Sequence, residues 1–539
     1  MKRIILATAA WFIVSIVLQG GITSPAQAAL PQTAPTGLTQ GWTRTWGGNS
    51  DDNAANVAVD RWGNLYVSGS FAGTVNFDPR GANPAATFTS SNGTADAFLS
   101  KFSPDGTFQW ARTWGGSFKV GSSYFGRDGA GGVGVDGLGS VYVTGSFQYT
   151  VDFNPDPGIS ENHTSNSGSQ NNIYLSKFSP DGTFQWVKTW GPADAGGEGY
   201  SLAVDGANAV YVVGDFSGST TNFNPWDAQH PDQHINHPPI NQGDPLLFDA
   251  FLSKFDADGN FIWAKTWGGE GYDDGPGVAV DGAGGVYVAG MYASTVINFD
   301  PAGGSGGANH PAHDSGIKVD VFLSKFDSSG SFQWVRTWGG QGKDDIAISA
   351  AVDGAGSIYV GGRFECTNCD FNPGGTADIH SSNGLMDAFV SKFDSSGTFQ
   401  WARTWGGPGD DATGGLAVDG WGNVYATGQY SGTVNFAQGS GIDNHASLGL
   451  HDVFAAEFAA NKAFLGMKSW GGSGEDYGYR IAYSGAGRLE VVGSFSATVD
   501  FNPGGTADNH TANGMADALL TRFSSVNLSH GVYIPLVTR

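Results

Sequence analysis

A Trp-Gly pair preceded by Thr or Ser recurs seven times along the chain, at intervals of 65 to 77 residues. A period of this length indicates one repeated structural unit that covers the hydrophobic surface of its neighbours. We therefore expect one large repeat domain, although the length of 539 residues alone would suggest three or four domains. The tryptophans of these pairs are Trp46, Trp114, Trp190, Trp267, Trp338, Trp405 and Trp470.

Each unit contains two hairpin patterns. In the first, an apolar stretch such as residues 416–419 turns through the Gly-rich residues 420–423 into residues 424–428. In the second, residues 97–102 pass through Ser-Pro-Asp-Gly, the sequence of a type I turn, into residues 108–114. Four strands per unit predict an all-β fold, a seven-bladed β-propeller of four-stranded antiparallel blades.

The two ends of the repeat array predict how the ring closes. Residues 42–46 form a fourth strand without the rest of its unit, and residues 517–523 form a third strand without a fourth. Pairing them completes the last blade and leaves no exposed sheet edge. We therefore expect a propeller over residues 41–523 whose last blade is closed by the N- and C-terminal strands.

The segments outside the ring indicate export. Residues 1–28 combine Lys2 and Arg3, an apolar run and the cleavage pattern Ala-Gln-Ala, which predicts a secretory signal peptide. The apolar run is shorter than the ~20 residues that a membrane-spanning helix needs, which argues against an uncleaved anchor. We expect a linker at 29–40, a tail at 524–539, no membrane span in the mature chain, and a secreted or cell-surface location.

Charge and a few rare residues limit the partners. A formal net charge of −24 argues against nucleic acids and anionic membranes, because both require clustered Lys and Arg. Cys366 and Cys369 predict a local disulfide in an exported chain, with a redox-active pair as the alternative. The absence of a second cysteine pair in the sequence argues against a zinc site at the cysteines. The long loop with His230, His234 and His237 is either a plain loop or a zinc site.

An acid stands seven or eight residues before the first hairpin turn of every unit. Because the small residues of the following strand suit the crowded centre of a ring, we expect all seven acids near one mouth of the central channel. They either cap loops by accepting backbone N–H groups or bind calcium or another hard cation. Calcium is thus the candidate cofactor. The seven acids are Asp52, Asp128, Glu198, Asp274, Asp345, Asp411 and Asp476.

The fourth strand alternates Trp, a basic residue and Trp, as in Trp110, Arg112 and Trp114. The two-residue period places these side chains on one face, where a cation–π contact contributes about 0.5 to 1 kcal/mol. The aromatic residues either pack blade against blade or form a sugar-binding platform.

The repeated patterns V-x-V-D-G-x-G-N-V-Y-V-T-G-S-F and D-A-F-L-S-K-F-x-x-x-G-x-F-x-W-x-[RK]-T-W-G-G resemble the bacterial SBBP family of seven-bladed β-propeller repeats. The first hairpin is also similar to the NHL repeat. The resemblance covers roughly residues 41 to 523. It implies the fold and no shared catalytic residues.

We therefore expect an exported binding or interaction module for surface carbohydrate, protein or cations. The alternatives are a propeller enzyme, such as a lyase, lactonase or glycosidase, and a purely structural surface protein. Catalytic residues should break the sevenfold symmetry near the channel. The sequence shows no such break apart from the histidine-rich loop and the cysteine pair, which favours a protein without catalytic residues.

Overall fold

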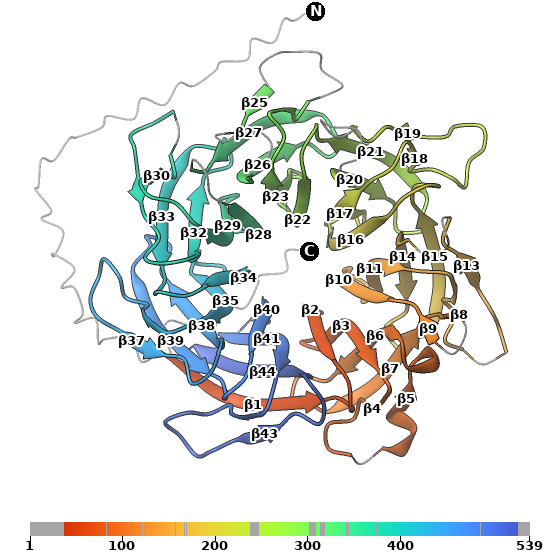
Figure 1. The fold of residues 1–539 in the computed structure, drawn as a ribbon, viewed down its shortest axis with the longest axis horizontal. Helices are drawn as coiled ribbons and strands as arrows, with labels where there is room; N and C mark the ends of the chain where they lie inside the picture. Colours follow the sequence, from red (N-terminus) through yellow and green to blue (C-terminus); the bar gives the residue numbers. More distant parts are fainter. Residues whose placement is uncertain are drawn as a thin grey trace, which may run out of the picture. The chain divides into compact units, whose positions relative to one another are not determined.

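The computed structural model describes residues 37–525, except 82, 121–122, 157, 167, 169, 238–246, 301–308, 313–317, 341–343, 373 and 486. In this part of the chain, seven four-stranded antiparallel sheets lie as blades around a common axis (Figure 1). The innermost strands of neighbouring blades contact one another around the whole ring. The predicted all-β, seven-bladed propeller is thereby confirmed.

Every blade has the same strand order, from the axis outward. The innermost strands are β2 (Asn53–Val59), β10 (Gly129–Val135), β16 (Gly197–Val204), β22 (Asp273–Val280), β28 (Asp345–Val352), β34 (Ala412–Val418) and β40 (Tyr477–Tyr483). The second strands are β3 (Leu65–Ala72), β11 (Val141–Phe147), β17 (Val210–Phe216), β23 (Val286–Tyr292), β29 (Ile358–Phe364), β35 (Val424–Tyr430) and β41 (Arg488–Phe495). The third strands are β6 (Ala95–Phe102), β14 (Asn172–Phe178), β20 (Asp249–Phe255), β26 (Asp320–Phe326), β32 (Asp387–Phe393), β38 (Asp452–Phe458) and β44 (Asp517–Ser525). The fourth strands are β7 (Phe108–Trp114), β15 (Phe184–Trp190), β21 (Phe261–Trp267), β27 (Phe332–Trp338), β33 (Phe399–Trp405), β39 (Phe464–Trp470) and β1 (Leu38–Trp46). We number the blades from the first, which contains β2, to the seventh, which contains β40.

The seventh blade is closed by both ends of the array, as predicted. Strand β1 pairs antiparallel with β44, in a register that places Trp42 opposite Arg522 and Trp46 opposite Ala518. Both strands are longer than expected: β1 begins at Leu38, and β44 ends at Ser525. The outer edge of β44 is thus covered by the first strand of the ring.

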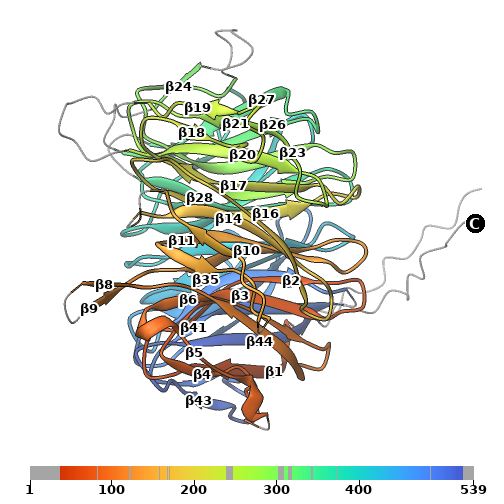
Figure 2. The same cartoon turned by 90° about the vertical axis from the view of Figure 1, so that its right-hand side faces the viewer.

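The loops between second and third strands hold short hairpins that the sequence patterns did not predict. Figure 2 shows the sheets of successive blades from the side. The short hairpins are β4 (Thr74–Asn76) with β5 (Thr87–Thr89), β12 (Thr150–Asp152) with β13 (Asn162–Thr164), β18 (Thr221–Asn222) with β19 (Gln233–His234), β24 (Val296–Asn298) with β25 (Asn309–Pro311), β30 (Cys369–Asp370) with β31 (Ile379–His380), β36 (Thr433–Asn435) with β37 (Asn444–Ala446), and β42 (Thr498–Asp500) with β43 (Asn509–Thr511). A further hairpin, β8 (Phe118–Val120) with β9 (Ser123–Phe125), precedes the second blade, and the 3-10 helices η1 (Pro84–Ala86) and η2 (Ser91–Gly93) lie in the first.

The repeated Trp-Gly tryptophan joins one blade to the next. Trp114, at the end of β7, is 2% exposed and contacts two aromatic rings of β14 in the second blade. Its ring lies edge-on to Tyr174 at 6.0 Å and stacks on Phe178 at 5.6 Å. This burial of a large aromatic surface explains why the residue recurs in every unit.

The other two members of the fourth-strand pattern also pack against the next blade. Arg112 Nε donates to the Gly182 carbonyl at 2.8 Å, and its guanidinium lies 5.4 Å from the centre of the Trp110 ring. Gly182 has φ of +84°, and a Cβ there would approach Trp110 to 2.9 Å, so the turn requires glycine. These contacts support blade packing rather than an open sugar platform.

The predicted signal peptide lies outside the described residues, as do residues 29–36 of the predicted linker and residues 526–539 of the predicted tail. Within the described ranges, no helix has the length and apolar character needed to cross a bilayer.

Candidate functional site

Five of the seven predicted acids have one shared structural role. Asp411 is a representative: its Oδ2 accepts the Gly407 N–H at 2.7 Å and its Oδ1 accepts the Ser431 N–H at 2.9 Å. Through these two hydrogen bonds, each acid links the loop that enters its blade to the end of the second strand of the same blade. The five acids with this pair of bonds are Asp52, Asp128, Asp345, Asp411 and Asp476.

These five carboxylates are covered rather than open to a channel. Each is at most 1% exposed. Burial raises the pKa of Asp411 to about 7, although its two N–H bonds act in the opposite direction. In the described part of the chain, the one group of three His, Cys, Asp or Glu residues whose ligand atoms all lie within 4.8 Å is Asp345 with Cys366 and Cys369. The geometry supports loop capping for the five acids.

Glu198 and Asp274 lie one residue away from this capping position. In the fourth blade Asp273 occupies it, accepting the Gly269 N–H at 2.9 Å and the Ala293 N–H at 3.1 Å. In the third blade Gly197 occupies this position. Its N–H donates a hydrogen bond to the preceding blade, as the N–H of Asp273 does in the fourth blade. A shift of one residue along a strand turns the side chain to the opposite face.

On that other face, Glu198 and Asp274 form a cluster with Asp215 and Tyr200. Tyr200 Oη donates to Asp215 Oδ2 at 2.9 Å, and the Glu198 N–H donates to Asp215 Oδ1 at 3.3 Å. Asp215 is 1% exposed and Asp274 is 4% exposed. Within the described residues, Asp274 Oδ1 has no hydrogen-bond partner. Asp215 and Asp274 are thus buried at the junction of the third and fourth blades, with the half-buried Glu198 beside them.

Burial and mutual repulsion favour protonation of this cluster. Burial, followed by the charges of Asp274 and Glu198, raises the pKa of the Asp215 carboxyl well above its ordinary value. Burial is also the main reason that the pKa of Asp274 is raised to about 7, with the charges of Glu198 and Asp273 adding to it. The raised pKa values of Asp215 and Asp274 favour their protonated forms at a pH where ordinary carboxyls are ionised.

The cluster breaks the sevenfold repeat, so the expectation of no such break was wrong. Glu198 pairs with Asp215 across β16 and β17. The corresponding pairs in the other blades each contain at most one acid. They are Asn53 with Ser70, Gly129 with Ser146, Asp274 with Met291, Ile346 with Arg363, Ala412 with Gln429, and Tyr477 with Ser494.

A cavity of about 230 Å³ opens beside this cluster and spans the first three blades. Glu198 and Tyr200 form part of its wall, and both are half-buried. Arg127 from the loop before β10, Asn53 from β2 and Ser146 from β11 also line it. The cavity therefore combines an acid, a base, an aromatic ring and neutral hydrogen-bonding groups.

The cluster predicts a pH-dependent stability. Because the folded-state pKa of Asp274 is raised above its unfolded value, its contribution to the free energy of unfolding is full below about pH 4 and is lost as pH rises through about 7. The melting temperature should therefore fall between pH 5 and pH 8, as measured by calorimetry. Asp274→Asn should reduce this fall, whereas Asp258→Asn, at an exposed turn of the third blade, should not. An equal fall in both variants would contradict the assignment.

Among the described residues, the three loop histidines do not come together as a group of possible metal ligands. His230 Nδ1 contacts Asp227 at 2.9 Å, and His237 Nδ1 contacts Asp249 at 2.8 Å. His234 belongs instead to a repeated contact that the sequence analysis missed. In it a histidine Nδ1 lies 2.8 to 3.1 Å from a fourth-strand hydroxyl. Among the described residues, the histidines are His163, His234, His310, His380, His445 and His510.

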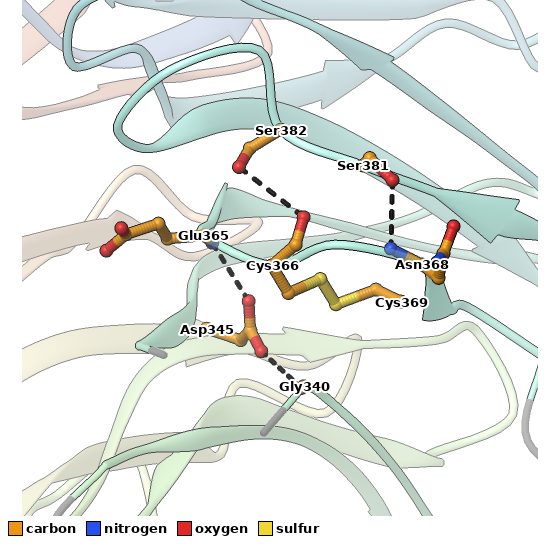
Figure 3. The surroundings of a disulfide bond; sticks show 8 residues. All are labelled: Gly340, Asp345, Glu365, Cys366, Asn368, Cys369, Ser381 and Ser382. Carbon is orange, nitrogen blue, oxygen red and sulfur yellow. Dashed lines mark hydrogen bonds between the residues drawn. A yellow bond between two sulfur atoms is a disulfide. The ribbon is translucent and has the colours of Figure 1, made fainter. Parts of the chain in front are cut away.

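The two cysteines form a disulfide in the loop that follows β29 (Figure 3). Cys366 and Cys369 are each 3% exposed and belong to the core of the fifth blade. In the neighbouring sixth blade, the position of Cys369 in the short hairpin is taken by Val434.

Comparisons with known proteins support the repeat character. No protein-family model matches the sequence. An uncharacterized WD repeat-containing protein of Acanthamoeba polyphaga mimivirus is 26% identical over 234 residues, which cover 40% of this chain and 16% of that protein. The regulatory protein FlaEY of Caulobacter vibrioides is 28% identical over 223 residues, which cover 40% of this chain and 21% of that protein. The chain thus matches less than a quarter of the length of either relative.

Solved structures with detectable similarity are distant. A quinohemoprotein alcohol dehydrogenase from Pseudomonas putida HK5 has a TM-score of 0.36 and 11% identity, over 94% of this chain and 80% of the other. An ulvan lyase has a TM-score of 0.38 and 10% identity, over 84% and 93%. A gluconolactonase from Xanthomonas campestris has a TM-score of 0.26 and 11% identity, over 72% and 95%. At these scores the similarities carry no argument about activity.

Proposed function

We propose that this protein is an exported propeller of the SBBP kind that binds a carbohydrate in the cavity beside Glu198 and Tyr200. The break in the sevenfold repeat carries this proposal. A position that serves only the ring should look alike in every blade, whereas a pair of acids like Glu198 and Asp215 occurs at this register in one described blade, and Glu198 lines a cavity.

The chemistry of the cavity wall suits sugar hydroxyls, which both donate and accept hydrogen bonds. Arg127 and Asn53 supply N–H donors, and Glu198 supplies acceptor oxygens. Tyr200 offers a ring held in place by its bond to buried Asp215. The volume of about 230 Å³ is below the ~300–1,000 Å³ of pockets that enclose drug-sized ligands. We therefore expect the cavity to take one sugar ring or the end of a chain.

A glycan array with the mature protein tests this proposal. The best-bound glycan should lose about 10- to 100-fold in affinity with Glu198→Gln, which weakens a charge-assisted hydrogen bond worth about 1.5 to 3 kcal/mol. Tyr200→Ala should weaken binding as well. Tyr479→Ala is the matched control, because Tyr479 holds the same bulge position in β40 and does not line the cavity. Failure to bind any glycan, or equal losses in Tyr200→Ala and Tyr479→Ala, would refute the proposal.

Calcium at the acidic cluster is a second candidate, because Asp274 Oδ1 is buried without a partner. Calcium prefers oxygen ligands, and it would have to draw the three carboxylates together, since their oxygens do not all lie within 4.8 Å of one another. At a hundredfold excess over its dissociation constant it should stabilise the fold by about 2.7 kcal/mol. Calorimetry at pH 8 should show this response reduced in Asp274→Asn and intact in the capping variant Asp411→Asn. An unchanged response in Asp274→Asn, or none in the wild type, rules this site out.

The same raised carboxyls would suit general acid catalysis of a lyase or glycosidase, since perturbed pKa values gather at active sites. Polysaccharides bound on the array provide the substrates to test. Cleavage products that appear with wild type and not with Asp215→Asn would indicate an enzyme, and intact glycan would indicate a binding module.

A further inference from the structure

Three metal-ligating side chains meet in the fifth blade. The sulfur atoms of Cys366 and Cys369 and a carboxylate oxygen of Asp345 all lie within 4.8 Å of one another. All three residues are buried. Figure 3 shows the Asp345 carboxylate beside the disulfide, with hydrogen bonds to Gly340 and Glu365. Sequence spacing alone gave the cysteines no third ligand, because Asp345 belongs to the innermost strand of the blade and the cysteines follow the second.

We propose that reduction of the Cys366–Cys369 disulfide converts this cluster into a binding site for Zn²⁺ or a similar divalent metal. A dithiol reductant supplies two electrons and two protons, is itself oxidised to a disulfide, and leaves two thiols in the loop. The metal then displaces both thiol protons and is held by two thiolates and the Asp345 carboxylate. Three protein ligands leave the fourth tetrahedral position for water.

The backbone of this loop already has the spacing that a thiolate pair needs. The two residues are separated by three positions, with Cα atoms 5.9 Å apart. The spacing Cys-x-x-Cys is the one by which zinc sites gather two thiolates from one turn. Reduction therefore requires the sulfur atoms to separate within a short loop that follows β29 and enters β30, where Cys369 pairs with His380.

The third ligand is oriented independently of the disulfide. Asp345 Oδ2 accepts the Gly340 N–H at 2.7 Å, and Oδ1 accepts the Glu365 N–H at 3.0 Å. Outer hydrogen bonds of this kind fix the direction of a ligating carboxylate. Gly340 also packs on the cysteines, because a Cβ there would lie 2.5 Å from Cys366 Cβ and 3.0 Å from Cys369 Sγ. The carboxylate thus keeps its place when the disulfide opens.

The sixth blade provides the matched control. Asp411 accepts the same two backbone N–H groups there, and Val434 stands at the position of Cys369. If buried aspartates of this type bound metal by themselves, both blades would bind. If the sulfur atoms are required, only the fifth blade would.

The test is a Co²⁺ titration of the whole protein, oxidised or reduced with a dithiol that is then removed without air. The reduced protein should bind one Co²⁺ per chain with a thiolate-to-metal absorption band, and Zn²⁺ should displace it. The oxidised protein should show no such band. Asp345→Asn should weaken Co²⁺ binding at least tenfold, Cys369→Val should abolish the band, and Asp411→Asn should leave both unchanged.

Several outcomes would overturn the proposal. They are a reduced protein without the band, a band that persists in Cys369→Val, and an affinity that Asp345→Asn leaves unaltered. Circular dichroism checks that each variant is folded, and Cys369→Val introduces the residue of the sixth blade at this position. If Asp345→Asn does not fold, the melting temperatures of wild type and Cys369→Val test the site instead. Zn²⁺ should raise it in reduced wild type and leave it unchanged in Cys369→Val, and equal shifts would refute the site.

Discussion

A chain that lacks residues 38–46 should not form a soluble ring that unfolds in one cooperative transition. Those residues are β1, the outer strand of the seventh blade, which pairs with β44 from Leu38 to Trp46. Without them, β44 presents an open edge that can pair with other molecules. The deletion also removes Trp46, whose ring contacts Phe98 and Phe102 of the first blade at 6.1 and 5.5 Å. Size-exclusion chromatography should show aggregates, and calorimetry should show a lost or strongly lowered transition.

A chain beginning at residue 37 is the control, because it keeps β1 and should melt like the full-length protein. Adding a peptide of residues 37–47 to freshly refolded deletion variant should recover part of the monomer. A monomeric deletion variant with the melting temperature of wild type would show that the termini do not close the ring.

Breaking the buried ion pair between Arg522 and Glu490 should lower the free energy of unfolding by about 3 to 5 kcal/mol, because it leaves one charge buried without a partner. Arg522 Nε donates to Glu490 Oε1 at 2.8 Å, and Glu490 is fully buried. Arg522→Met or Glu490→Ala removes one partner. Equilibrium unfolding in denaturant measures the loss, and Arg80→Met, at an exposed arginine, should stay within about 0.5 kcal/mol of wild type.

The first five blades show what replaces this pair. At the same register they carry a tyrosine under a lysine, as in the first blade, where Lys101 Nζ lies 5.0 Å from the centre of the Tyr66 ring. The double variant Glu490→Tyr with Arg522→Lys should therefore recover most of the stability lost in either single variant. A double variant less stable than both singles, or single losses below about 1 kcal/mol, would contradict this account.

Much of the fold could be predicted because it depends on periods and turns. Four strands per unit follow from alternating residues and glycine-rich turns, and closure follows from the strands at 42–46 and 517–523 that lacked partners. Packing between blades was one of the two roles predicted for the Trp-Gly tryptophan, but its partners, such as Tyr174 and Phe178 for Trp114, could not be predicted because they lie in the following blade.

The acidic cluster was missed although one signal for it was present. Glu198 and Asp274 precede the next hairpin turn by seven residues, whereas the five capping acids do so by eight. That single residue reverses the face on which the side chain lies. The remaining step needed the structure, because Asp215 joins the cluster through pairing of β16 with β17, and Asp274 joins it from the next blade.

The histidine contacts show a different limit. An acid two residues before a histidine recurs at Glu161 and His163 and at Asp508 and His510, which is a visible period. Its meaning depends on the hydroxyl that each histidine meets, Thr189 for His163 and Thr45 for His510. The latter pair is separated by most of the chain and meets only because the ring closes.

Hydrogen exchange measured by mass spectrometry, with and without the best-bound glycan, tests most directly whether the cavity beside Glu198 and Tyr200 is the ligand site. Binding should slow exchange in residues 127–131 and 198–200, which line the cavity, and should leave the corresponding residues 410–414 and 475–479 of the sixth and seventh blades unchanged. Slowed exchange confined to the fourth strands, or spread equally over all seven blades, would show that the ligand binds elsewhere and that the break in the repeat does not mark the site.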